Sequence, residues 1–215
     1  MSADPSSSSK TSIRRRAPRG EGDRLRDEIL GAAESLLVET GNEDLVSIRA
    51  IADAVGVTPP SIYRHFADKD ELVMQLCERR FEDLNKAFDD AEAASSDPVE
   101  RLKELGRAYA NFALQHPEHY RVLMMTPSEM RAEEFGREDS QGRRAFYRLV
   151  EAVAACGETG WIKADDPVTT AVVLWSGIHG LVSLLITSPE FPWPDEPARL
   201  VERVLDSQMS SLLRM

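Results

Sequence analysis

The chain has 215 residues and a mass of 24.0 kDa, enough for one or two compact domains with a real core. Hydrophobic residues make up 42% and charged residues 29%. Both values are ordinary for a globular protein and atypical of a disordered chain. The net charge of −11 is uneven: residues 1–66 carry nine Lys and Arg against ten Asp and Glu (−1), so residues 67–215 carry −10. The acidity therefore belongs to the C-terminal part, and the N-terminal part remains compatible with a polyanionic partner.

The few metal-ligating residues of the sequence do not form a recognisable motif. Cys77 and Cys156 are the only cysteines and neither has a second Cys or a His nearby, so we expect buried thiols in a reducing cytoplasm, with redox sensing as the alternative. His116 and His119 are three apart, but Pro117 is expected to break the helical face that a metal-binding pair would share. We expect no metal and no cofactor.

The N-terminal segment is basic and lacks the apolar stretch of a secretory signal, so residues 1–21 are expected to form a disordered arm. Between positions 10 and 26 the only acidic residues are Glu21 and Asp23. Over the same positions the basic residues are Lys10, Arg14, Arg15, Arg16, Arg19, Arg24 and Arg26. The arm is either a solubilising tail or a segment that contacts phosphates or a minor groove, and its position beside the first helix favours the second role.

Apolar periodicity predicts a first helix from about Asp23 to Thr40, ended by Gly41. Its buried stripe should be formed by Leu25, Ile29, Ala32, Ala33, Leu36 and Leu37. A second, short helix follows Ser47, a favourable N-cap, with an apolar stripe of Ile48, Ile51, Ala52 and Val55. Gly56 should end this helix with a positive φ.

A third helix is expected to start at Thr58, a second N-cap, and Pro59, which suits the first helical position. Ile62 and Phe66 lie four apart and should point inward. The outward face then holds Pro60, Ser61 and Arg64, with Tyr63 and His65 on its flanks, and Asp68 with Glu71 should cap the next helix. Two short helices around a glycine turn form the helix-turn-helix unit, whose second helix enters the major groove of DNA.

The same stretch resembles the N-terminal DNA-binding domain of the TetR family of bacterial transcriptional regulators, from about Leu25 to Leu76. The shared features are the pair Ile51-Ala52, the Gly56 turn, and Tyr63-x-His65-Phe66 followed by Lys69. The resemblance implies an all-α protein with a DNA-binding domain at 22–68, a linking helix at 69–97, and a ligand-binding and dimerisation bundle at 98–215.

The DNA-binding residues divide by their chemistry. Phosphates are expected to be held by Ser47, Tyr63, His65 and Lys69, and base edges to be read by Arg49, Pro60, Ser61 and Arg64. Thr58 and Pro59 belong to the same surface. The alternatives are an enzyme, for which no catalytic grouping or phosphate loop is present in the sequence, and a helical adaptor that binds protein through this hairpin.

The remaining chain is also predicted to be helical. The expected helices are 69–94, 98–116, 143–156, 167–189 and 196–213, with a short apolar segment at 118–125 and a loop at 126–142. The segment 167–189 has no Lys, Arg, Asp or Glu and is long enough to span a membrane, but acidic residues flank both ends. We therefore expect a helix covered partly by a second copy of the chain, approached closely at Ser176, Gly177, Gly180 and Ser183.

Trp175-x-x-x-His179-Gly180 is similar to the signature of one subgroup of TetR C-terminal domains, which would cover residues 98–215 here. The resemblance implies a small-molecule effector pocket, with Trp175 and His179 at the pocket or at the dimer seam, where a structural contact between the two is the alternative to ligand binding. Its candidate residues are Tyr109, Phe112, Met124, Met125, Trp175 and His179. The sequence thus predicts a homodimeric regulator without a membrane partner, most simply a ligand-released repressor on a near-palindromic operator, with an activator as the alternative.

Overall fold

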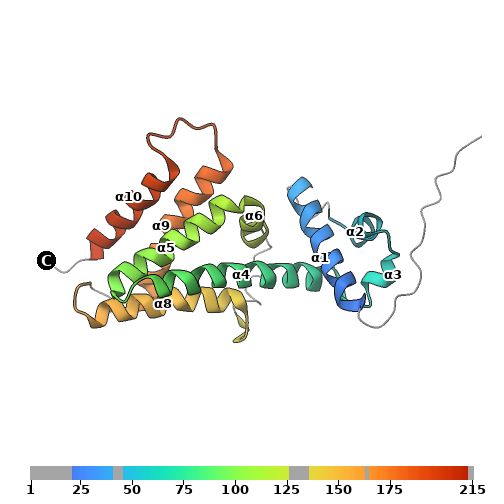
Figure 1. Cartoon of the computed structure of the whole chain (residues 1–215), viewed down its shortest axis with the longest axis horizontal. Coiled ribbons are helices and arrows are strands. Elements are labelled where there is room, and N and C mark those ends of the chain that lie inside the picture. Colours follow the sequence, from blue (N-terminus) through green and yellow to red (C-terminus); the bar gives the residue numbers. More distant parts are fainter. Residues whose placement is uncertain (1–20, 41–45, 126–135, 163–164, 213–215) are drawn as a thin grey trace, which may run out of the picture. The chain divides into compact units, whose positions relative to one another are not determined.

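The computed structural model describes residues 21–40, 46–125, 136–162 and 165–212, and the elements with described bounds are all α-helices (Figure 1). The predicted all-α fold is therefore confirmed. The chain divides into two compact units, Met1–Leu76 and Cys77–Met215. The helices in chain order are α1 (Glu21–Thr40), α2 (Ile48–Val55), α3 (Pro59–Ile62), α4 (Lys69–Ala94), α5 (Pro98–Gln115), α6 (Pro117–Met125), α8 (Gln141–Glu158), α9 (Pro167–Thr187) and α10 (Pro197–Leu212).

The core of the first unit forms where α1, α2, α3 and the start of α4 bring their apolar stripes together. Its fully or almost fully buried side chains are Ile29, Leu30, Ala33, Val46, Ile51, Ala52, Ile62, Phe66, Leu72, Val73 and Leu76. The inward orientation predicted for Ile62 and Phe66 is confirmed, and Leu30 adds a buried position beside the expected α1 stripe. The predicted basic arm, residues 1–21, lies almost wholly outside the described residues.

The turn between α2 and α3 is built around Gly56, whose φ of 76° lies in the left-handed region predicted for it. The N–H of Val57 donates to the carbonyl of Ala52 (2.9 Å), and that of Gly56 to Asp53 (3.3 Å), which satisfies the end of α2. At the other end of α2, the Ser47 hydroxyl accepts from the N–H of Ala50 (3.1 Å) as an N-cap. These contacts fix the path of the chain into α3.

Replacing Gly56 with alanine is expected to destabilise the protein by about 1–2 kcal/mol, the cost of placing a Cβ in the left-handed region. A Cβ at Gly56 meets no atom within 4 Å, so the cost arises from the backbone alone. Urea denaturation measures it. Gly31→Ala on α1, where an added Cβ also meets nothing, is the matched control and should stabilise by up to about 1 kcal/mol. If Gly56→Ala and Gly31→Ala lowered the free energy of unfolding by the same amount, the left-handed φ of Gly56 would not be the cause.

Three local details around α3 differ from the sequence prediction. The helix ends at Ile62, and the chain continues to Phe66 as turns whose N–H groups still bond to the Ile62 carbonyl. Thr58 occupies the N-cap position but makes no side-chain cap, because its hydroxyl lies 3.2 Å from the Ser61 hydroxyl instead. At the start of α4, Asp68 accepts a hydrogen bond from the N–H of Glu71, as expected. The Glu71 carboxylate accepts one from the N–H of Ala67, whereas a capping box would use the N–H of Asp68.

Helix α4 begins in the first unit and ends in the second, with the bounds Lys69–Ala94 that the sequence predicted. In the second unit α5 packs against α8, α9 and α10, and α9 packs against both α8 and α10. The buried apolar side chains come from all of these helices and from α6, so they form one continuous core. Arg148 of α8 ties that helix to α4 through Asp89 (2.8 Å) and Glu92 (2.5 Å).

Helix α5 ends just before Pro117, as predicted, but Pro117 is also the first residue of α6, where a missing N–H removes no hydrogen bond. One predicted boundary in the second unit was wrong. Helix α8 starts at Gln141, two residues before the predicted position, because Ser140 caps it by accepting from the N–H of Arg143 (3.0 Å). The first part of the predicted loop, 126–135, lies outside the described residues.

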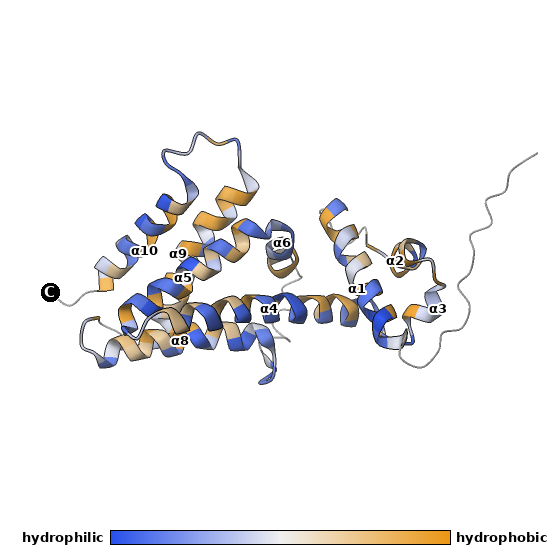
Figure 2. Ribbon diagram, viewed as in Figure 1, coloured by the Kyte–Doolittle hydropathy of each residue, from blue (hydrophilic) through white to orange (hydrophobic). Residues whose placement is uncertain are grey.

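Helix α9 is the most apolar helix of the described part of the chain (Figure 2). One face is buried, as at Ile178 (4% exposed), whereas Val173 (59%) and Leu184 (54%) are exposed on another face. By length and composition alone α9 could cross a bilayer, a test that a core helix of a soluble protein also passes. A single chain therefore leaves one apolar side of α9 uncovered.

Candidate functional site

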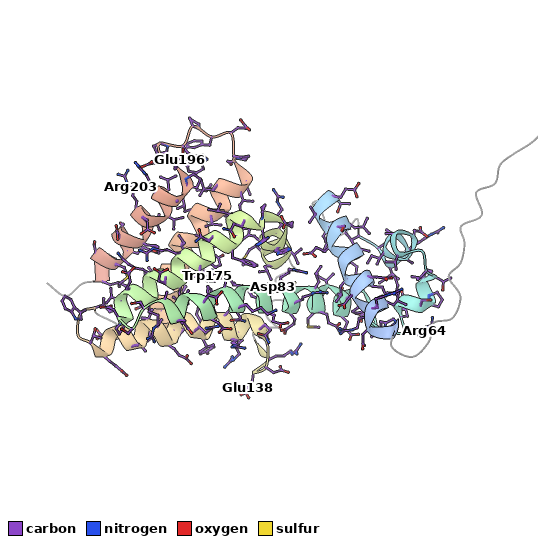
Figure 3. The ribbon with its side chains drawn as sticks, in the orientation of Figure 1. Arg64, Asp83, Glu138, Trp175, Glu196 and Arg203 are labelled. Carbon is purple, nitrogen blue, oxygen red and sulfur yellow. The ribbon has the colours of Figure 1, made fainter. Side chains whose placement is uncertain are left out.

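The outward side of α2 and α3 presents a connected row of polar side chains. The hydroxyls of Thr58 and Ser61 lie 3.2 Å apart, and an Nη atom of Arg64 donates to the Ser61 hydroxyl (3.0 Å). Thr58, Pro60 and Arg64 are exposed, and Ser61 is partly buried (Arg64 is labelled in Figure 3). The row therefore holds the Arg64 guanidinium, a group that recognises guanine edges or phosphates, in a defined position on the surface.

The other predicted DNA-binding residues surround this row within the first unit. Ser47 and Arg49 are exposed at the start of α2, and Tyr63 is 54% exposed directly after α3. Partly buried positions are taken by Pro59, His65 and Lys69. Lys69 is the first residue of α4, where Asp68 accepts from the N–H of Glu71 and the first turn also carries Asp70.

Arg26, the last residue of the basic run that starts at Lys10, lies in α1 and has a structural role. Its guanidinium lies 5.4 Å from the centre of the buried Phe66 ring and donates to the Gln75 side chain of α4. Gln75 in turn donates to Glu71 (2.9 Å). The side chain thus joins α1 to the start of α4.

A cavity of about 370 Å³ lies inside the second unit. Its wall is almost entirely apolar or aromatic, and helices α4, α5, α6, α8, α9 and α10 all contribute to it. The lining residues are Phe81, Leu84, Phe88, Leu102, Lys103, Leu105, Gly106, Tyr109, Leu123, Met124, Gly142, Ala145, Phe146, Leu149, Leu174, Trp175, Ile178, Leu205, Gln208 and Met209. Such a volume and composition suit a small, largely hydrocarbon ligand.

The structure places the six predicted ligand-binding residues in different surroundings. Tyr109, Met124 and Trp175 line the cavity. Phe112 lies outside that lining, against the imidazole of His116 (ring centres 5.7 Å apart). His179 is also outside it, behind Tyr109, and nothing is described of the side chain of Met125.

His179 lies in a cluster of aromatic side chains next to the cavity. Its Nδ1 is 2.8 Å from the hydroxyl of Tyr109 and 3.1 Å from that of Tyr120, and its ring lies 5.4 Å from the Trp175 ring. Burial raises the pKa of both tyrosines above the ordinary value, so both hydroxyls remain protonated at neutral pH. The cluster therefore fixes the orientation of Tyr109, whose side chain forms part of the cavity wall.

The reason given above for excluding a metal at His116 and His119 was wrong. Because Pro117 starts α6, the two rings are stacked with centres 4.9 Å apart, and a carboxylate oxygen of Glu118 lies 3.7 Å from a nitrogen of each. Arg80 Nη1 lies 3.3 Å from His119 Nε2, and burial together with this cation lowers the pKa of His119. A cation at the nitrogen disfavours a metal there, and the absence of a metal stays a prediction.

Both cysteines are buried and reduced, as predicted. Burial raises the pKa of the Cys156 thiol to about 11, and its sulfur lies 3.0 Å from the carbonyl oxygen of Pro98. At neutral pH this thiol is therefore protonated and unreactive.

Two parts of the cavity wall were not assigned to a site from the sequence. Phe81, Leu84 and Phe88 of α4 were predicted to face inward, but their spacing gave no sign that they face a cavity rather than a filled core. Gln208 of α10 was missed altogether, since a lone glutamine on an amphipathic helix carries no signal. Gly177 was assigned to a contact with a second copy, but it faces Gln208 of the same chain.

Comparison with known proteins links both units to one family. Residues 29–76 match the family described as bacterial regulatory proteins, tetR family. Residues 102–208 match the family described as tetracyclin repressor-like, C-terminal domain. The first match contains α2, α3 and the start of α4, and the second contains most of the cavity wall.

The activator FasR of Mycolicibacterium smegmatis is 29% identical over 109 residues, 51% of this chain and 49% of FasR. The repressor KstR2 of Mycobacterium tuberculosis is 30% identical over 105 residues, 49% of this chain and 51% of KstR2. These alignments span about half the length of the curated relatives, which are transcription regulators rather than enzymes.

A TetR-family regulator from Marinobacter aquaeolei VT8 has the same fold, with a TM-score of 0.69 and 20% identity over 92% of this chain and 100% of that chain. Members of this family bind DNA, dimerise and bind small-molecule effectors. Since a helix-turn-helix and a helical bundle with an apolar cavity stand here in the family's order, the chain belongs to the TetR family of DNA-binding transcriptional regulators.

Proposed function

We propose that the protein is a cytoplasmic, homodimeric repressor that leaves a near-palindromic operator when a small molecule enters the cavity. The observation that supports this proposal is the course of helix α4. It begins at Lys69, shortly after Arg64 in the chain, and its residues Phe81, Leu84 and Phe88 form part of the cavity wall. A ligand that moves these side chains would therefore act on the helix that carries a phosphate-binding residue.

In this proposal Arg64 reads base edges from its position beside Ser61, and Arg49, Pro60 and Ser61 assist it. Ser47, Tyr63, His65 and Lys69 hold phosphates. Thr58 and Pro59 support the row from the start of α3. Phosphate contacts fix the register of the protein on DNA, and base contacts set the sequence preference.

The exposed apolar face of α9 supports a homodimer. Val172, Val173 and Leu184 are each more than a third exposed in the single chain, and the exposed Ser176 lies between them on the helix. A second copy covering this face would bury it without introducing a charge, and α10 packs beside α9. The dimer would present two α3 segments about 34–36 Å apart, one turn of DNA, or farther.

The Trp175-x-x-x-His179-Gly180 subgroup belongs to the same proposal. The contacts that His179 makes with Trp175 and Tyr109 give the motif a structural reason, since His179 supports two residues that line the cavity. Activation is the alternative direction of control, because one relative is named an activator and another a repressor. Expression of a reporter from the operator, with and without the protein, distinguishes the two.

DNA binding is tested by selecting preferred sites from a random pool and measuring affinity by fluorescence anisotropy at two salt concentrations. Arg64→Ala is expected to lose about 1–3 kcal/mol of discrimination at its base pair and to change the selected sequence. Lys69→Ala should weaken all sequences alike and reduce the salt dependence by about one released ion.

Arg121→Ala removes an exposed arginine from α6 in the second unit and serves as the control, with unchanged affinity and preference. A protein that selects no sequence from the pool would refute sequence-specific regulation. If Arg64→Ala selected the wild-type site with the wild-type affinity, the assignment of base reading to Arg64 would be wrong, and Arg49 would be tested next.

A further inference from the structure

Arg80 of α4 and His119 of α6 form a contact between two helices, and both side chains are largely shielded from solvent. Nη1 of Arg80 lies 3.3 Å from Nε2 of His119, and the exposed fractions of the two side chains are 12% and 19%. The uncharged ring of Phe112 in α5 packs against His119, with ring centres 6.1 Å apart. A guanidinium has no acceptor atom, so Arg80 donates the hydrogen bond and His119 accepts it as the neutral imidazole.

Each of the two side chains also has a charged neighbour within its own helix. The same Nη1 atom of Arg80 pairs with Asp83 of α4 (2.8 Å), and the same Nε2 atom of His119 lies 3.7 Å from a carboxylate oxygen of Glu118 in α6. A proton on Nε2 removes the acceptor for Arg80 and brings two cations together, but it turns the Glu118 contact into an ion pair. Protonation therefore exchanges a contact between helices for a contact within α6.

The groups around His119 determine when this exchange occurs. The ring of His116 is stacked on that of His119, with centres 4.9 Å apart. Burial, Arg80 and His116 lower the pKa of His119, whereas Glu118 and Asp83 raise it, and the net shift is downward from the ordinary value. The contact with Arg80 is therefore intact at neutral pH and is lost as the pH falls through this pKa.

The contact lies one helical turn from the wall of the cavity on both helices. Leu84 follows Arg80 by four residues and Leu123 follows His119 by four, so each pair shares one face of its helix. Leu84 and Leu123 both line the cavity. Release of α6 from α4 at Arg80 would therefore loosen the wall that holds a bound ligand.

We propose that Arg80 and His119 form a pH-sensitive switch that makes the affinity of the cavity for its effector depend on the proton concentration. The neutral imidazole ties α6 to α4, and the imidazolium releases it, so acidification weakens effector binding. A repressor with this switch needs more effector to leave its operator at acid pH. The inference rests on the proposed function, in which the cavity binds the effector, but the release of α6 can be measured without a ligand.

Hydrogen–deuterium exchange on the full chain tests the release of α6. The wild type is compared with His119→Gln at the same pH, because the glutamine oxygen can still accept from Arg80 but the side chain does not titrate. At about pH 8 the two proteins should exchange alike in residues 117–125. At about pH 5.5 the wild type should exchange about tenfold faster there, the effect of one lost hydrogen bond to a charged group. His116→Gln is the matched control and should behave as the wild type does.

Isothermal titration calorimetry with 1-decanol, an apolar probe that does not itself titrate, tests the effect on the cavity. The wild type is expected to bind it about fivefold more weakly at about pH 5.5 than at about pH 8, whereas His119→Gln should bind it equally at both. His116→Gln should keep the dependence of the wild type. A dependence that survives in His119→Gln would assign the titration to another group, such as His179, and would overturn the proposal.

A second variant covers the case in which His119→Gln does not fold. Arg80→Met removes the donor at every pH, so its affinity for 1-decanol should be independent of pH and equal to that of the wild type in acid. An Arg80→Met protein that keeps the wild-type pH dependence would overturn the switch.

The remaining outcomes separate the switch from the proposed function. Equal exchange of α6 in the wild type and His119→Gln at acid pH would overturn the switch and leave the cavity as the effector site. If 1-decanol bound at neither pH, the coupling to the cavity would fail together with the assignment of the cavity, while the exchange experiment would still decide whether acid releases α6.

Discussion

Replacing Val173 with glutamate is expected to convert the protein into a monomer and to weaken operator binding by at least about 100-fold. Val173 is 59% exposed on the apolar face of α9. If a second copy covers that face, the variant buries an unpaired carboxylate, which costs about 3–5 kcal/mol at each of two symmetric positions. A monomer holds one half-site and loses the joint binding of two. Light scattering coupled to size exclusion gives the mass, and anisotropy gives the affinity.

The matched control places the same charge elsewhere on the second unit. Tyr147 of α8 is 39% exposed, and Tyr147→Glu should remain dimeric with the wild-type affinity for DNA. A Val173→Glu protein that keeps the mass of a dimer would show that the α9 face is not the interface. A monomeric wild type would have the same implication, and the exposed apolar side chains would then need another partner.

Phe66→Ala is expected to destabilise the first unit by about 3–5 kcal/mol, a large part of the about 5–15 kcal/mol that stabilises a whole domain. The ring is 1% exposed, and the variant loses both its packing and its contact with the Arg26 guanidinium. Urea denaturation measures the loss. Hydrogen–deuterium exchange should accelerate in residues 21–76 and remain unchanged in α8, α9 and α10.

Tyr63→Ala, three residues earlier, should give the opposite pattern. Its ring is 54% exposed, so the free energy of unfolding should change by no more than about 0.5 kcal/mol while DNA affinity falls. The pair separates folding from recognition within one turn of the chain. If Phe66→Ala unfolded no more easily than Tyr63→Ala, the assignment of Phe66 to the core of the first unit would be contradicted.

Local signals account for the parts of the fold that were predicted well. The bounds of α4 follow from the Asp68 and Glu71 caps at its start and from the Ser95–Pro98 break after its end. The Gly56 turn and the burial of Ile62 and Phe66 follow from backbone preference and from four-residue spacing. Each of these features depends on residues close together in the sequence, so each could be read without the tertiary structure.

The errors arise where distant residues decide the outcome. A helix does end just before Pro117, as predicted, but nothing in the sequence indicated that Pro117 also begins α6. Gly177 suited a contact with any helix, and α10 of the same chain occupies the space above it. The structural role of Arg26 was not predicted, because the sequence does not show that Phe66 and Gln75 lie beside it.

The candidate sites were predictable to different degrees for the same reason. The exposed row from Thr58 to Arg64 comes from one continuous stretch, so its members could be named from the sequence. Six helices form the cavity wall. A side chain belongs to that wall only if the side chains opposite it leave space in front of it. Of the residues predicted to bind a ligand, Tyr109, Met124 and Trp175 line the cavity, whereas Phe112 and His179 lie outside that wall.

The length of α4 determines how far a small change in the cavity is carried. From Phe88 to Lys69 the helix rises about 28 Å, at about 1.5 Å per residue. A tilt of about 5° about the Phe88 end would move the Lys69 end by about 2.5 Å if the helix stays straight. A hydrogen bond to a phosphate is lost over roughly 1 Å. In the proposed mechanism the helix would act as a lever, and a tilt of about 5° at the cavity would be enough to release a phosphate bound at Lys69.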